Sequence, residues 1–230
     1  MSAEETIVIA LSLKVALVAT FFCVPAAIGI ALLLARGEFY GKALLSALVH
    51  LPLLLPPVVT GYALLLAFGR KGFIGAPLYD LTGFTFAFRW WGAALAAALM
   101  TLPVVVQPIR IAFEAIEEDL LEAAVMSGAS RWQTFRHVSL PLAMPGVLAG
   151  LVLGFVKALG EFGATITFVS NIPGETQTLS LAIYSLLQTP NGDAGALRLV
   201  WVAVVLAFSA VFASDYISRR MKQPKPISRN

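Results

Sequence analysis

The chain has 230 residues, of which 59% are hydrophobic and only 13% are charged, and its mean hydropathy is +0.85. Soluble domains usually carry about a quarter charged residues, so this composition excludes a typical soluble protein and makes membrane lipid the main surrounding. The net charge is only +3 and the basic residues fall in short clusters between apolar runs, which excludes a nucleic-acid-binding role. The single cysteine, Cys23, lies inside an apolar run and is interpreted as a packing residue.

Five apolar segments are long enough to be membrane-spanning helices, which need about 20 mainly apolar residues. The first is too long for a cleavable signal peptide, and acidic Glu4 and Glu5 precede it where a signal would be basic. We therefore expect an all-α, polytopic membrane helical bundle in which residues 1–218 form one transmembrane domain. The five predicted spans cover about 7–35, 43–68, 90–113, 142–169 and 197–218.

Two further segments are partly apolar but too short to cross a membrane. The stretch 73–88 follows Gly72 and is interrupted by Gly75, Pro77 and Gly83, and the stretch 178–188 has only about eleven residues. Both are interpreted as interfacial or re-entrant pieces on the outer side. The alternative is that one of them completes a sixth span.

The distribution of basic residues predicts the orientation, because Lys and Arg in short loops stay in the cytoplasm. With the C-terminus inside, ten basic residues fall on the inner side and four on the outer side. This predicts an outer N-terminus, a cytoplasmic loop at about 114–141 and a basic cytoplasmic tail at 219–230. The inner set is Arg36, Lys42, Arg110, Arg131, Arg136, Arg219, Arg220, Lys222, Lys225 and Arg229; the outer set is Arg70, Lys71, Arg89 and Arg198.

The cytoplasmic loop contains start and stop signals for two short helices. Asp119 followed three residues later by Glu122 is typical of a capping box, and Gly128 stands where a helix ends with a positive φ. This predicts a helix over about 120–127. Ser130 followed by Gln133 repeats the start signal, so a second short helix should run to the proline that opens the next membrane helix.

The spacing of small residues in this loop resembles the "EAA" loop of the permeases of ABC importers. A polar loop between two spans often forms a helical hairpin without further function. Here, however, the triplet Glu122-Ala123-Ala124, the glycine Gly128 and the ending Leu140-Pro141 are spaced at the intervals of that family, with Val138 where Ile is usual. The resemblance implies that the loop docks into a separate ATPase subunit. The residues implied in coupling are Glu122, Ala123, Ala124, Gly128, Leu140 and Pro141.

Two more stretches resemble the molybdate-type permeases within that family. They are 50–75, which contains His50-Leu51-Pro52 and Pro56-Pro57, and 160–176, which begins Gly160-Glu161-Phe162-Gly163. The resemblance implies the fold of type I ABC importer permeases, a bacterial cytoplasmic membrane, and molybdate, with tungstate, as substrate. It also implies two permease copies, two ATPase subunits and a periplasmic or extracellular molybdate-binding protein. A sulfate or other oxyanion permease is the alternative.

No residue pattern predicts a catalytic, metal or nucleotide site on this chain. The sequence has no G-x-x-x-x-G-K-[ST], and Gly69-Arg70-Lys71-Gly72 lacks the spacing of a phosphate loop. The only histidines, His50 and His137, have no acidic residues at metal-ligand spacing. We therefore expect no cofactor here, and expect ATP-Mg on the partner ATPase.

Prolines and hydroxyls mark the predicted translocation pathway. Prolines interrupt membrane helices and are tolerated where neighbours or water satisfy the freed carbonyls, which favours a pathway lining near Pro56 and Pro57. Conduction of an anion requires weak binding, so neutral polar side chains are expected to line the outer part of the fourth span. The predicted lining residues there are Thr165, Thr167, Ser170 and Asn171.

Lys157 and Glu161 are the ionisable residues deepest in a predicted span, and their spacing of four places them on one helix face. Because a mid-membrane charge costs at least about 2.5 to 3.5 kcal/mol, the two are expected to neutralise each other in a structural or gating pair. Two other functional classes stay open. An ion-coupled secondary transporter would need inverted repeats that are not detected, and a membrane-embedded enzyme would need the sites found missing above.

Overall fold

The computed structural model describes residues 2–222, and within them all regular structure is helical. Four helices are long and apolar enough to cross a membrane: α1 (Ala3–Arg36), α5 (Trp90–Glu114), the continuous helix Arg131–Leu159 and α11 (Asp193–Lys222). The bent pair α2 (Lys42–Leu54) and α3 (Pro57–Phe68) counts as a fifth span when taken together. The prediction of an all-α bundle with about five spans is confirmed.

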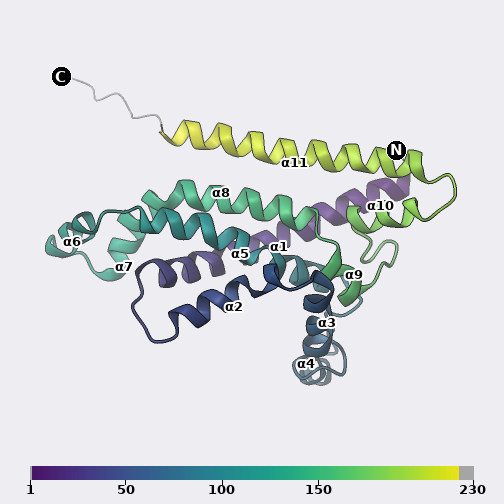
Figure 1. Cartoon of the computed structure of the whole chain (residues 1–230), viewed down its shortest axis with the longest axis horizontal. Helices are drawn as coiled ribbons and strands as arrows, with labels where there is room; N and C mark the ends of the chain where they lie inside the picture. The colour runs from purple at the N-terminus through teal and green to yellow at the C-terminus, as the bar shows by residue number, and fades with distance from the viewer. Residues whose placement is uncertain (1, 223–230) are drawn as a thin grey trace.

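Helix α5 is the centre of the bundle, because it packs against α1 and against α8 (Leu140–Leu159). The long helices α1, α8 and α11 run along the long axis of the molecule (Figure 1). Small side chains fill the contact between α1 and α5, which lets the two backbones approach closely in the manner of membrane helices. The fully buried alanines of this contact are Ala16, Ala27 and Ala31 of α1 and Ala93, Ala96 and Ala97 of α5.

The core is divided into two apolar clusters along the bundle. One joins side chains of α1 and α5 to α9 (Gly163–Val169) and α10 (Leu179–Leu187). The other joins the later turns of α1 and α5 to α2 and α8. Figure 1 shows α10 beside the N-terminus at one end, called here the α10 end, and α6 (Glu118–Met126) with α7 (Arg131–Thr134) at the opposite end, called the α6 end.

The second predicted span is broken in the middle, where α2 and α3 meet at an angle of 112°. Pro56 and Pro57 explain the break, because a proline forces the preceding residue out of the helical region and lacks a backbone N–H. Leu55 and Pro56 accordingly have extended ψ angles of 149° and 132°. Pro52, in contrast, lies within α2 without ending it.

The fourth predicted span is also broken, so the expectation of one continuous helix over 142–169 was wrong. Helix α8 ends at Leu159, and α9 begins at Gly163. Between them the backbone leaves the helical path, with φ −133° and ψ −57° at Phe162. Both breaks shorten a membrane span and leave a short second half, α3 or α9.

The short predicted segments form short helices, α4 (Gly75–Thr82) and α10, so neither completes a further span in the described part of the chain. Helix α11 continues to Lys222, and the rest of the predicted basic tail, 223–230, lies outside the described residues. The face of α11 carries large apolar side chains that are exposed, as expected for contact with lipid. They include Trp201, Val205, Phe208 and Phe212.

The contact between α1 and α5 can be tested with two neighbouring alanines. Ala27 is 0% exposed and packs in the core, whereas Ala26 on the same turn is exposed. Ala27→Leu should overpack the contact and lower the free energy of unfolding by about 1–3 kcal/mol. Thermal unfolding of the purified protein in detergent should show a clear drop for Ala27→Leu and little change for Ala26→Leu; equal drops would contradict the close packing described here.

Candidate functional site: the α6 end and the two helix breaks

Helix α6 stands on the surface at the α6 end and has no buried residue. It begins after Glu117, whose side chain makes no capping bond, so the predicted capping box of Asp119 and Glu122 was wrong. Asp119 already lies in the first turn beside Glu118, where acidic side chains interact favourably with the positive end of the helix dipole. The helix therefore starts about two residues earlier than expected.

Gly128 ends α6 in the way that the sequence predicts. Its φ is +86°, and its N–H donates to the Val125 carbonyl oxygen at 2.9 Å. The N–H of Ala129 donates to the Ala124 carbonyl oxygen at 3.1 Å. These two bonds are the pair of a Schellman motif, which requires a left-handed residue at this position, so the chain reverses sharply at Gly128.

The second short helix begins with the predicted capping box. The Gln133 N–H donates to Ser130 Oγ at 3.3 Å, and the Ser130 N–H donates to Gln133 Oε1 at 2.8 Å. The helix does not stop before Pro141, however, but runs without interruption from Arg131 to Leu159. Pro141 lies in the first turn of α8, as predicted, but α8 continues the second short helix and is not separated from it.

A wide turn explains how this helix passes the proline. Residues Phe135–Ser139 form a π-helical turn, in which the Leu140 N–H donates to the Phe135 carbonyl oxygen five residues back. Pro141 has no N–H to give to an earlier carbonyl, and such π-turns accommodate an irregularity without ending a helix. The surface loop and the membrane helix are consequently one continuous rod.

Arg36 and two apolar side chains tie the loop to the bundle. The guanidinium of Arg36 donates to the carbonyl oxygens of Phe113, at 2.7 Å, and of Ile116, just after α5 ends. It also lies 3.6 Å from the Glu118 carboxylate at the start of α6. Leu121 and Phe135 pack against the core cluster of the α6 end. The sequence analysis missed Arg36; a basic residue at the end of a long helix, beside a polar loop, was the available signal.

The exposed surface of this loop includes large apolar side chains among its charged and polar ones. Met126 is 88% exposed and Trp132 is 66% exposed. A hollow of about 350 Å³ beside Glu122 is lined by Leu121, Val125 and Met126. Exposed apolar side chains gathered in this way mark a surface for binding another protein.

The six residues predicted for coupling divide into two groups. Glu122, Ala123 and Gly128 are exposed on the loop. Leu140 is partly buried against the core cluster, and Pro141 lies in the continuous helix just beyond it. Ala124 is partly buried and supplies the carbonyl of the turn at Gly128. Glu122, Ala123 and Gly128 therefore face outward, whereas Ala124, Leu140 and Pro141 shape the base of the loop.

The two helix breaks lie side by side, because α3 packs closely against α9. A Cβ added to Gly163 would lie 2.6 Å from Pro57 Cβ, and one added to Gly61 would lie 2.5 Å from the Ala164 carbonyl oxygen. Real Cβ atoms do not approach so closely, so both positions require glycine. Pro56 and Pro57, predicted for the pathway, are exposed at this junction.

The polar residues predicted for the pathway do not form one lining. Thr165 is 1% exposed and packs inside the chain, so its hydroxyl does not reach a surface. Thr167 donates its hydroxyl hydrogen to the Gly163 carbonyl oxygen at 2.9 Å, and Asn171 Nδ2 donates to Ser185 Oγ at 2.6 Å. Ser170 is exposed with φ +64° just after α9. Of the four predicted residues, Thr167 and Ser170 are thus better placed to line a pathway.

Lys157 and Glu161 form the expected pair, with Lys157 Nζ donating to Glu161 Oε2 at 2.9 Å. The Glu161 side chain is 3% exposed and that of Lys157 is 35% exposed. Glu161 makes a second contact that the sequence did not predict. Its Oε1 accepts a hydrogen bond from the Ala164 N–H in the first turn of α9, at 3.1 Å.

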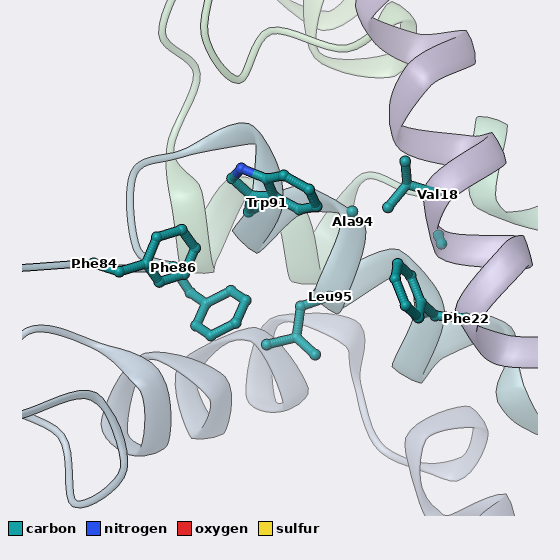
Figure 2. A pocket seen from close by; sticks show the side chains of 9 residues that line it. Val18, Phe22, Phe84, Phe86, Trp91, Ala94 and Leu95 are labelled. Carbon is teal, nitrogen blue, oxygen red and sulfur yellow. The ribbon is translucent and has the colours of Figure 1, made fainter. Parts of the chain in front are cut away.

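A hollow of about 440 Å³ lies between α1 and α5, as Figure 2 shows. Its lining is almost wholly apolar and contains no charged side chain: Val18, Ala19, Phe22, Phe84, Phe86, Trp91, Ala94, Leu95 and Ala98. A multiply charged anion would lose its hydration there without a compensating partner. The hollow is therefore suited to an apolar occupant.

Comparison with known proteins places these features in a family. The family described as "Binding-protein-dependent transport system inner membrane component" matches residues 27–223. The "Molybdenum transport system permease protein ModB" of Escherichia coli (strain K12) is 53% identical over 209 residues, covering 91% of each chain. The protein of the same name from Haemophilus influenzae is 52% identical over 219 residues, covering 95% of this chain and 96% of the relative.

A solved structure shares the fold at low sequence identity. The crystal structure of a bacterial ABC transporter involved in the import of the acidic polysaccharide alginate contains a chain that matches with a TM-score of 0.77. The match covers 97% of this chain and 82% of that chain at 21% identity. The overall helical arrangement is thus shared with that transporter chain.

The anchoring role of Arg36 can be tested by hydrogen exchange. Arg36→Met should remove the charge-assisted bonds to the Phe113 and Ile116 carbonyls, each worth about 1.5–3 kcal/mol, and so speed exchange of the amides of residues 118–126. Arg110→Met is the matched control, since within the described part of the chain Arg110 pairs with Glu114 of its own helix, at 2.7 Å. Unchanged exchange in Arg36→Met, or equal changes in both variants, would contradict the anchoring role.

Proposed function

Because this chain belongs to the family of binding-protein-dependent transport system inner membrane components, we propose that it is the membrane-spanning subunit of an ABC importer for molybdate, with tungstate as a second substrate. The observation that carries this proposal is the identity of more than half of the aligned residues to molybdenum transport permeases over nearly the full length of both chains. The proposed substrate is imported through this chain, and the energy comes from ATP-Mg on a separate subunit.

The α6 end is the proposed contact with that ATPase. Helix α6 projects from the bundle with exposed apolar side chains, and its turn at Gly128 fixes the direction in which the continuous helix Arg131–Leu159 returns to the bundle. Burying Met126 and Trp132 in a cleft of the partner would supply the apolar anchors typical of a tight interface. Small Ala123 leaves room for close approach of the partner surface.

The proposed orientation places the α6 end in the cytoplasm and the α10 end outside. Arg36, Arg110, Arg131 and Arg136 lie on or next to the loop at the α6 end, which accords with the retention of basic residues in the cytoplasm. The N-terminus is then outside, and α11 brings the chain back to the cytoplasmic side. The α10 end would receive a substrate-binding protein of the outer compartment.

The proposed pathway runs between two copies of this chain, with two ATPase subunits below them. In one copy the second halves of the broken spans, α3 and α9, stand together with Pro56, Thr167 and Ser170 on accessible faces. These groups are uncharged, which suits an anion that must pass and not be retained. Movement of the α6 end on ATP binding would be transmitted to these half-helices and open the pathway in alternation.

Reconstitution in liposomes tests the proposal directly. The permease co-purified with its ATPase should take up radiolabelled molybdate only when ATP, Mg²⁺ and the binding protein are present, whereas the permease alone should hydrolyse no ATP. A tenfold excess of tungstate should compete strongly and sulfate weakly. Uptake that follows an ion gradient in the absence of ATP would favour a secondary transporter, and preferential uptake of sulfate would reassign the substrate.

The turn at Gly128 provides a second test, of the coupling surface alone. Gly128→Val places a β-branched residue at φ +86°, which is strained by at least about 1–2 kcal/mol, so uptake should be abolished while insertion into the membrane is retained. Gly128→Asn is the control, because asparagine tolerates this conformation, and it should keep most of the uptake. Normal uptake by Gly128→Val would refute the assignment of α6 as the coupling helix.

A further inference from the structure

We propose that Glu161 is a positioning residue that joins the end of α8 to the start of α9, so that movement of the loop at the α6 end reaches the pathway. The inference rests on the proposed function and extends it. It arises from the two oxygens of one buried carboxylate: Oε2 accepts from Lys157 of α8, and Oε1 accepts from the Ala164 N–H of α9. An ion pair alone would need only the first contact.

Helix α9 is too short to be stable by itself, so it relies on its packing against α3 and α5 and on this contact at its start. It has seven residues, well below the length at which an isolated helix persists, and Phe162 offers no side-chain cap. Its first N–H groups need acceptors, and one of them belongs to Ala164, which is 0% exposed. The Glu161 carboxylate supplies one such acceptor and holds α9 against the end of α8.

The same contact fixes α3, because α9 and α3 are packed without room between them. The close approaches at Gly163 and Gly61 leave no space for even one added methyl group. Thr167 packs at the same place, within reach of a Cβ on Gly61. A displacement of α9 therefore moves α3 with it.

The other end of the connection is the continuous helix Arg131–Leu159. It carries the loop residues at its start and Lys157 near its end, and neither the π-turn at Phe135–Ser139 nor the internal Pro145 ends it. A displacement of the loop is thus transmitted along this continuous helix to Lys157. The break at Gly160–Phe162 would absorb this displacement if no contact bridged it. Glu161 is the side chain that bridges the break, by hydrogen bonds to both sides.

Two double variants separate this role from simple charge pairing. In Lys157→Met with Glu161→Gln the pair is neutral, but the glutamine oxygen can still accept from the Ala164 N–H. In Lys157→Met with Glu161→Met the pair is equally neutral and similar in length, but the acceptor is gone. Both are measured as the complete complex with the ATPase, in the presence of the binding protein.

The glutamine variant should keep molybdate uptake within about threefold of the native complex. The methionine variant should hydrolyse ATP but transport at least about tenfold less molybdate per ATP, and the amides of residues 163–169 should exchange about three- to tenfold faster. Equal uptake and equal exchange in the two variants would overturn the proposal. Faster exchange with normal uptake would also overturn it, since α9 would then be loosened without consequence.

Two further outcomes are decisive. If the methionine variant does not assemble, the glutamine variant decides alone: retained uptake supports the proposal, and a tenfold loss shows that the charge and not the acceptor is required. If the native complex carries no molybdate, the proposed substrate is wrong, but hydrogen exchange of residues 163–169 and the ratio of ATPase rates with and without the binding protein still test the role of Glu161.

Discussion

A membrane helix cannot be interrupted unless the freed backbone groups find partners, and this constraint organises the structure. The two interruptions meet it in different ways. At Leu55–Pro57 the prolines remove N–H donors that would otherwise need acceptors. At Gly160–Phe162 the N–H groups remain, and the buried Glu161 carboxylate accepts from the N–H of Ala164, just beyond the break. Both breaks lie at one place, where Pro57 touches Gly163, so the irregular backbone is confined to a single junction.

The same chain must also connect this junction to the opposite end of the bundle. A helix that began afresh at Pro141 would be separated from the loop by a flexible joint. Instead the π-turn at Phe135–Ser139 keeps the loop and the membrane helix in one rod. Arg36 holds the other side of the loop by bonding the last carbonyls of the α5 region. The loop is therefore mounted on α1, α5 and α8 together and is not a free hairpin.

Sequence reasoning succeeded where the signal is local. The Ser130–Gln133 capping box and the positive φ of Gly128 depend only on neighbouring residues, and both are present. Prediction failed where one sequence pattern is compatible with two structures. Asp119 and Glu122 fit a capping box but lie inside the helix, and the hydropathy of 142–169 is continuous although the helix is not.

The candidate site was harder to predict than the fold, because it depends on contacts between distant segments. The spacing of Lys157 and Glu161 predicts their pairing, which is a property of one helix. It does not predict that Glu161 also caps α9, because that requires knowing that the helix stops. Likewise Thr165 and Thr167 look equivalent in sequence, and only the packing of α9 within the bundle buries Thr165 and leaves Thr167 partly accessible.

The distribution of charge bears on how an oxyanion could cross. Lys157, in the last turn of α8 before the break, is already neutralised by Glu161, and α3 and α9 carry no charged residue. A free cation there would hold a doubly charged anion too strongly for release, while the apolar hollow between α1 and α5 would exclude it. What remains beside the junction is neutral, and Thr167 and Ser170 make it partly polar. Such a surface lets an anion pass but distinguishes poorly between similar anions, so in the proposed importer the choice of substrate falls to the binding protein outside and the direction of transport to the ATPase inside.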